Sequence, residues 1–263
     1  MNAMPNSIIN SLKDLTEKID IKTEDINILP ACHTSSWKKL VDEIIPSGNV
    51  LKPTLNTDYD EELLFFFYGK AKYIPNEDLK DEYKADHPFT LIYNIENKLS
   101  KIHRLVVFDS GGFPRYNIDI SRKHFELKDC TAEKLKRLIS IFFKNNKNYI
   151  EGTMSPTLQP NDYPVCGVLN AYCKIGKKIN EKENTDYGEQ AITFEIQYKE
   201  FDFKDSLIAV CIPDTVLSSD ISKEQCKMVF GDKKLITYKT DTKAKSYYNM
   251  SDTIKYELYN DEI

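Results

Sequence analysis

Apolar residues recur along the chain in two patterns, the alternation typical of a strand and the three-to-four-residue spacing of an amphipathic helix. The segment 26–33, INILPACH, is apolar enough for a strand that enters the core. The apolar residues after it are spaced i, i+3, i+4 and i+7, which predicts a helix with one buried face. They are Trp37, Leu40, Val41 and Ile44.

Six consecutive apolar residues end the segment 61–68 and predict a fully buried strand. The segment 89–95 alternates between apolar and polar residues, which predicts a half-exposed strand. Further strands are expected at 102–108, 190–198, 206–212, 235–239 and 254–259.

Helices are expected in two other places. Near the N-terminus, Ile8, Leu12, Leu15 and Ile19 fall on one helical face, which predicts a short docking helix. Thr131 can cap a second helix, whose apolar stripe includes Leu135, Leu138, Ile139 and Phe142. The polar segment 174–188 is expected to be a mobile loop.

These elements predict an α+β fold whose strands are mainly antiparallel and flanked by helices. We expect residues 1–263 to form a single domain. Its parts would be an N-terminal docking helix (1–25), a catalytic core (26–213) and a C-terminal extension (214–263).

Composition narrows the class of protein. The net charge of −5 argues against general affinity for nucleic acid, although a local basic face is compatible with it. The six cysteines form no C-x-x-C pair and are expected to be free thiols in a reducing compartment. The sequence shows neither a membrane-spanning stretch nor the apolar core of a signal peptide, so we expect a cytoplasmic protein without a membrane partner.

The common motifs for phosphate loops, dinucleotide folds and zinc proteases are absent, and the histidines have no metal-ligand spacing, so no metal is expected. Three segments, each near the end of an apolar strand, remain candidates for a site. They are His33-Thr34-Ser35, FFFYGKAKY (65–73) and YGEQAITFEI (187–196). Structural roles compete with this interpretation: His33 as a satisfied polar group, Tyr68 as core packing and Glu189 as a solvated charge.

Taken in order, these segments resemble the ADP-ribosyltransferase superfamily. His33-Thr34-Ser35, an apolar helix and SGNVLKP resemble the family's first strand, helix and "G-x-L-x-P"-like second strand, with one residue inserted. The aromatic strand with Tyr68 and Lys70, and the late strand opening with Glu189, resemble its other two blocks. The match covers about residues 28–75 and 185–213 and is closest to the His-Tyr-Glu branch and its DarT-like bacterial toxins. No motif could be assigned to the stretch IHRLVVFDSGGFPRY (102–116).

The resemblance implies an ADP-ribosyltransferase-like split sheet that uses NAD as a substrate. Glu189 would stabilise the positive charge that develops on the sugar when nicotinamide leaves. The other implied NAD-binding residues are His33 on a ribose hydroxyl, Thr34 or Ser35 nearby, Tyr68 or Tyr73 on the nicotinamide ring, and Lys70 on the diphosphate. Glu195, on the same predicted strand face as Glu189, is a rival for the catalytic carboxylate.

The implied function is transfer of ADP-ribose to a nucleic acid or a protein, as in a bacterial toxin or defence effector with an antitoxin or regulatory partner. Residues 122–147 hold eight basic and three acidic residues and could contact a phosphate backbone, although a solvated helix face explains them slightly better. Two other hypotheses stay open. One is a non-catalytic binding module, and the other is a hydrolase with paired carboxylates such as Glu189 and Asp109, although Asp109-Ser110-Gly111-Gly112 also fits a turn.

Overall fold

Two compact units, each assembled from two separate stretches of chain, make up the computed structural model. Unit 1 contains Met1–Ile28 and Glu96–Tyr198, and unit 2 contains Leu29–Ile95 and Lys199–Ile263. The residues described are 9–48, 51–72, 87–116, 120–157, 167–180, 188–201, 205–218 and 220–260. The predicted boundaries at 25/26 and 213/214 do not coincide with these units. The single-domain prediction stays a prediction, because compact units can still fold together.

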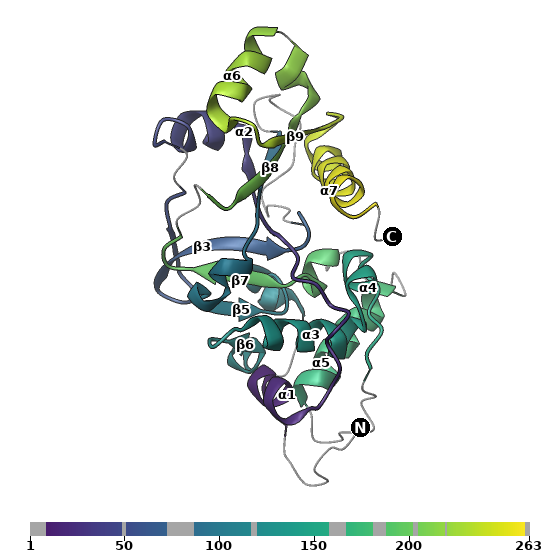
Figure 1. Cartoon of the computed structure of the whole chain (residues 1–263). Coiled ribbons are helices and arrows are strands. Elements are labelled where there is room, and N and C mark those ends of the chain that lie inside the picture. The colour runs from purple at the N-terminus through teal and green to yellow at the C-terminus, as the bar shows by residue number, and fades with distance from the viewer. Residues whose placement is uncertain are drawn as a thin grey trace. The chain divides into compact units, whose positions relative to one another are not determined.

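Unit 1 combines a small antiparallel sheet, in the order β6-β5-β7, with helices (Figure 1). Its elements are α1 (Leu12–Lys18), η3 (Glu96–Lys101), β5 (Arg104–Val106), η4 (Ser110–Tyr116), η5 (Arg122–Phe125), β6 (Glu126–Leu127), α3 (Ala132–Phe143), α4 (Asn146–Ile150), α5 (Gly167–Asn180), η7 (Glu189–Ile192) and β7 (Glu195–Tyr198).

The predicted helix after Thr131 is α3, and Thr131 caps it by accepting a hydrogen bond from the Lys134 N–H at 3.2 Å. All four residues of its predicted apolar stripe are buried. The predicted N-terminal docking helix is α1, which packs against α3. The Arg137 guanidinium donates to the carbonyls of Thr16 and Ile19 at the end of α1 and so fastens the two helices together.

Unit 2 is built on a sheet in the order β2-β3-β1-β4-β8-β9, in which the described pairs are antiparallel except β8 with β9. Its elements are β1 (Ala31–Ser36), α2 (Trp37–Lys39), the π-helical turn η1 (Leu40–Ile44), β2 (Thr54–Asn56), β3 (Glu61–Tyr68), β4 (Pro88–Tyr93), β8 (Leu207–Pro213), η8 (Asp214–Ser218), α6 (Asp220–Phe230), β9 (Lys234–Tyr238) and α7 (Lys243–Tyr259). The expectation of mixed helices and strands, mainly antiparallel, is therefore confirmed.

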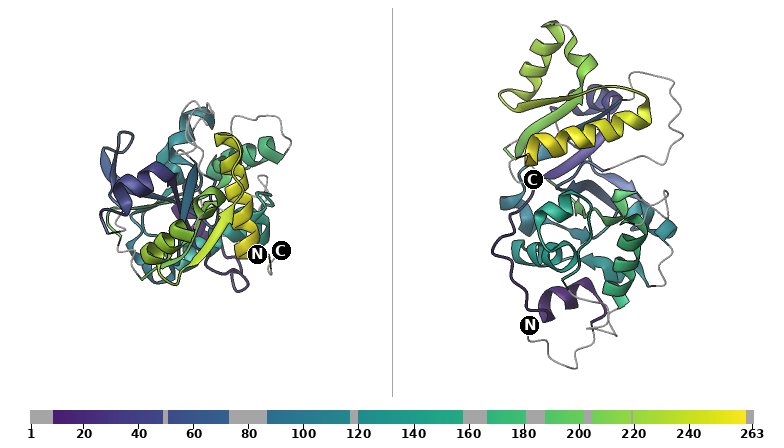
Figure 2. Two further views of the ribbon diagram at one scale, coloured as in Figure 1. Left: turned by 90° about the horizontal axis from the view of Figure 1, so that it is seen from above. Right: turned by 90° about the vertical axis from the view of Figure 1, so that its right-hand side faces the viewer.

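Helix α7 covers one face of this sheet, against β4, β8 and β9 (Figure 2). A hydrophobic cluster lies there, where Met250 and Ile254 of α7 pack with Cys32, Ile92 and Cys211 of the strands. His33 follows Cys32 in β1, and successive strand residues point to opposite faces. The imidazole therefore lies on the face away from α7.

Several predicted boundaries were wrong for identifiable reasons. The first strand begins at Ala31, after Pro30, which has no N–H to donate to a ladder, and runs on to Ser36 instead of ending at His33. β4 is buried along its whole length, because β1 and β8 flank it and α7 packs on it.

Two predicted segments have a different secondary structure. Residues 174–180 belong to α5 rather than to a loop, and 181–187 lie outside the described residues. The strand expected at 254–259 is the end of α7, whose buried residues Tyr247, Met250 and Ile254 follow helical spacing.

Candidate functional site

The imidazole of His33 is held by the backbone of the neighbouring strand. Its Nδ1 lies 2.9 Å from the carbonyl oxygen of Phe65 in β3. Burial lowers the pKa of His33 to about 4; the hydrogen bond to Phe65 opposes this and the charge of Lys39 adds to it. At neutral pH the ring is therefore uncharged. Because a carbonyl can only accept, Nδ1 carries the hydrogen, and Nε2 is left as an acceptor.

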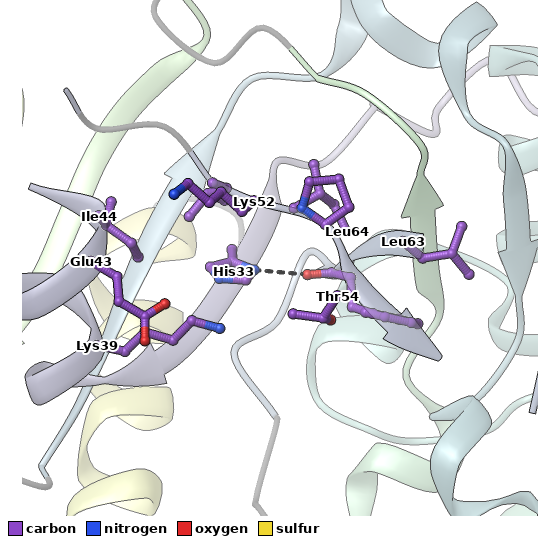
Figure 3. Close-up of a pocket in the computed structure, with 11 residues that line it drawn as sticks. His33, Lys39, Glu43, Ile44, Lys52, Thr54, Leu63 and Leu64 are labelled. Carbon is purple, nitrogen blue, oxygen red and sulfur yellow. Dashed lines mark hydrogen bonds between the residues drawn. The ribbon is translucent and has the colours of Figure 1, made fainter. Parts of the chain in front are cut away.

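His33 forms part of the wall of a pocket of about 230 Å³ in unit 2. The charged and polar residues that share this wall are Lys39 of α2, Glu43 of η1, Lys52 and Thr54. Figure 3 shows the side chains of Lys39 and Lys52 on two sides of the imidazole. Leu63 and Leu64 of β3 supply apolar lining. The pocket thus combines a neutral acceptor, two cations, a carboxylate and a hydroxyl.

Thr34 and Ser35 do not line this pocket. The Thr34 hydroxyl is 2.7 Å from that of Thr90, which in turn donates to the sulfur of Met250, so Thr34 belongs to the face covered by α7. Ser35 shares the face of His33 by alternation and is half-buried. The next residue, Ser36, caps the following helix by accepting from the Lys39 N–H.

Tyr68 and Lys70 are both buried, at 0% and 4% exposure, and neither lines the His33 pocket. The Tyr68 hydroxyl accepts a hydrogen bond from the Leu29 N–H at 2.8 Å. Stacking of Tyr68 on a nicotinamide ring would therefore require this side chain to leave its present packing. Tyr73 lies outside the described residues. The NAD-binding roles of these residues stay predictions.

Glu189 belongs to unit 1 and opens the 3₁₀ turn η7 rather than a strand. The prediction that Glu189 and Glu195 share one strand face was wrong, because strand alternation begins only at Glu195. The catalytic role of Glu189 stays a prediction.

Glu195 is a buried carboxylate with several hydrogen-bond donors around it. It accepts from the Ser110 N–H at 3.1 Å, the Ser110 hydroxyl at 2.8 Å and the Gln197 amide at 2.6 Å. Burial, and then the charge of Asp109, raise the pKa of Glu195 to about 7, although these donors oppose the shift. Burial also raises the pKa of Asp109, against the N–H of Gly111 and the charge of Arg115. Burial therefore favours the protonated form of both carboxyl groups.

The network extends from Glu195 across the small sheet of unit 1. The Gln197 amide oxygen accepts from Arg104 at 2.8 Å, and Arg104 and Arg122 lie 3.3 and 3.6 Å from the carboxylate of Glu126. Sequence reasoning assigned no role to these residues. The available signals were an arginine inside the apolar run of β5, and the E-x-Q spacing that puts Glu195 and Gln197 on one face of β7.

The hypothesis of a hydrolase that pairs Glu189 with Asp109 stays a prediction, and the structure adds Glu195 as a carboxylate that interacts electrostatically with Asp109. The predicted turn at Asp109 is confirmed: the Gly112 N–H donates to the Asp109 carbonyl at 3.0 Å. In the basic stretch 122–147, Lys134 and Arg137 pair with Glu17 and Glu133, which favours a solvated helix face over a phosphate-binding one.

Among the described residues, no group of three His, Cys, Asp or Glu side chains could hold a metal ion. No helix in the described part of the chain is both long and apolar enough to cross a membrane. No family model matches the chain, and comparisons with curated proteins and with solved structures also give no match.

Proposed function

We propose that this chain is an NAD-dependent ADP-ribosyltransferase that transfers ADP-ribose to a macromolecular acceptor, a nucleic acid or a protein, and that the His33 pocket holds part of the NAD. The observation that carries the proposal is the neutral imidazole of His33 on the wall of a polar pocket. With Nδ1 bound to the Phe65 carbonyl, Nε2 can accept a hydrogen bond from a ribose hydroxyl. The resemblance of the His33-Thr34-Ser35 block to the superfamily supports the same assignment.

The proposed reaction breaks the bond between nicotinamide and ribose, and positive charge develops on the sugar. A preorganised carboxylate stabilises such a transition state, and losing a contact of this kind typically costs about 10²–10³ in rate. We assign this role to Glu189. Glu195 is the weaker choice, because its carboxylate is buried and already accepts three hydrogen bonds from Ser110 and Gln197.

Nicotinamide release from NAD by the purified chain tests the proposal. Nicotinamide release is measured without an acceptor and with single-stranded DNA, RNA or cell lysate added. The proteins compared are the wild type, Glu189→Gln, Glu195→Gln and His33→Gln. Exposed Glu200→Gln serves as the matched control. We expect release that depends on one class of acceptor and falls at least about 100-fold in Glu189→Gln. Loss in Glu195→Gln alone, with wild-type thermal stability, would transfer the role to Glu195. No release under any condition would overturn the proposal.

The second candidate is a non-catalytic binding module for a nucleic acid or protein partner. It is favoured by the backbone hydrogen bonds that occupy His33 Nδ1 and the Tyr68 hydroxyl, which a purely structural role also explains. Binding of an acceptor nucleic acid or protein without nicotinamide release would support this candidate over the transferase.

A further inference from the structure

The His33 pocket carries positive charge that its own structure does not neutralise. Lys39 and Lys52 both line it, and neither forms an ion pair with a carboxylate in the part of the chain that the structure describes. Lys39 is half-buried and Lys52 is exposed. Among the described residues that line the pocket, Glu43 is the only acidic one, so the lysines outnumber it there.

The size of the pocket limits what it can hold. Its volume of about 230 Å³ lies below the roughly 300–1,000 Å³ of pockets that enclose a whole ligand. A dinucleotide would therefore place only a fragment inside. A fragment that complements the pocket has negative charge, which can pair with the lysines, and hydroxyl groups, which can hydrogen-bond to His33, Thr54 and Glu43. A sugar with its attached phosphates has both the negative charge and the hydroxyl groups.

We propose that Lys39 and Lys52 bind the diphosphate of the dinucleotide, on two sides of His33, while the attached ribose occupies the pocket (Figure 3). This inference rests on the proposed function in taking the ligand to be NAD. It is an alternative to the diphosphate role that the resemblance implies for Lys70, which is buried and does not line this pocket. Lysine suits the role because its ammonium meets phosphate as a point charge without requiring a fixed planar geometry.

ADP-ribose is the appropriate probe, because it keeps the diphosphate and both sugars but has no nicotinamide to lose. Its affinity is measured by titration calorimetry for the wild type, Lys39→Gln, Lys52→Gln and the double variant. The matched control is Lys38→Gln, since Lys38 is exposed beside Lys39 but does not line the pocket. Adenosine, which lacks phosphate, is titrated in parallel, and thermal unfolding by circular dichroism verifies that each variant folds.

We expect each pocket lysine to contribute about a tenfold change in the affinity for ADP-ribose. Salt should weaken binding to the wild type more than to the double variant. Lys38→Gln should bind ADP-ribose with the affinity of the wild type. The affinity for adenosine should be the same for the wild type and all the variants. The inference is overturned if the folded double variant binds ADP-ribose within twofold of the wild type, if Lys38→Gln loses as much, or if the wild type does not bind ADP-ribose.

The two proposals fail in different ways. Lysine-dependent binding of ADP-ribose without nicotinamide release would leave the phosphate-binding assignment standing and remove the transferase. Nicotinamide release with the same KM for NAD in the wild type and the double variant would keep the transferase and remove the role of the lysines.

Discussion

At the scale of single residues, the carboxylate of Glu195 in unit 1 is buried and held by several hydrogen bonds. Ser110 and Gln197 supply donors that favour its ionised form, whereas burial and Asp109 favour its protonated form. Arg104 donates to Gln197, which in turn donates to Glu195, while Arg115 and Tyr116 of η4 interact electrostatically with Asp109. Burial and Asp109 prevail and raise its pKa to about 7. The protonation of Glu195 therefore couples the stability of unit 1 to pH near neutrality.

Replacing Glu195 by Gln should change how stability depends on pH. Between its ordinary pKa of 4.5 and about 7, native Glu195 keeps a proton that the unfolded chain has released, so wild-type stability falls as pH rises. The glutamine side chain of the variant cannot titrate. The unfolding free energy of Glu195→Gln minus that of the wild type should therefore rise by about 1–3 kcal/mol from pH 5 to pH 8.

Urea unfolding at a series of pH values, followed by circular dichroism, measures this difference. Exposed Glu200→Gln is the control and should differ from the wild type by a nearly constant amount. A difference for Glu195→Gln that stays flat or falls with pH would show that Glu195 is ionised in the native state well below pH 7.

At the scale of elements, the sequence correctly predicted the helices and strands whose capping residue or apolar pattern lies within one short stretch of chain. The helix after Thr131 has its cap and apolar stripe within one short stretch, and the buried strand 61–68 has an uninterrupted apolar run. The turn η7 and the end of α7 were misread as strands. Short apolar runs do not distinguish a strand from a buried helix, and the neighbours that decide between them are distant in sequence.

The cap of α3 gives a direct test at this scale. Thr131→Ala removes the side-chain acceptor of the Lys134 N–H and should lower the unfolding free energy by about 1 kcal/mol. Thr131→Ser keeps the hydroxyl and should stay close to the wild type. Urea unfolding of the wild type and the two variants measures the loss of unfolding free energy. The dependence of that free energy on urea concentration is taken as the same for all three proteins. Equal stability of the Ala and Ser variants would mean that water replaces the cap at no cost.

At the scale of the whole molecule, sequence reasoning placed His33 in a site but could not find its surroundings. The Phe65 carbonyl, which fixes the tautomer of His33, comes from β3, Lys39 comes from α2, and Lys52 and Thr54 come from the stretch that leads into β2. These groups lie around His33 because β1 pairs with its neighbouring strands, and no local sequence pattern predicts that pairing. Lys70 lies in a motif-like block but is buried and does not line the pocket. Lys52 also lies in such a block, SGNVLKP, but sequence reasoning assigned it no role of its own, and Lys39 lies in none.

The C-terminal segment 214–263, predicted to be an extension, is part of the core of unit 2. It supplies Ile236, Tyr238, Tyr247, Met250 and Ile254 to the hydrophobic cluster between α7 and the sheet. Burying each such side chain contributes about 1.5–3 kcal/mol, so the five together approach the roughly 5–15 kcal/mol that holds a typical domain folded. The two stretches of chain in unit 2 should therefore fold only together.

Shortening the chain after Pro213 should accordingly leave unit 2 unfolded and abolish binding of ADP-ribose, although the residues that line the pocket all remain. A milder test uses one helix. Met250→Ala deletes a fully buried side chain from α7 and should cost about 2–5 kcal/mol, whereas Tyr248→Ala, at a position 56% exposed on the same helix, should cost little. Thermal unfolding and titration with ADP-ribose measure both effects. A shortened chain that still binds ADP-ribose would mean that β1, β3 and β4 hold the His33 pocket without the cluster behind them.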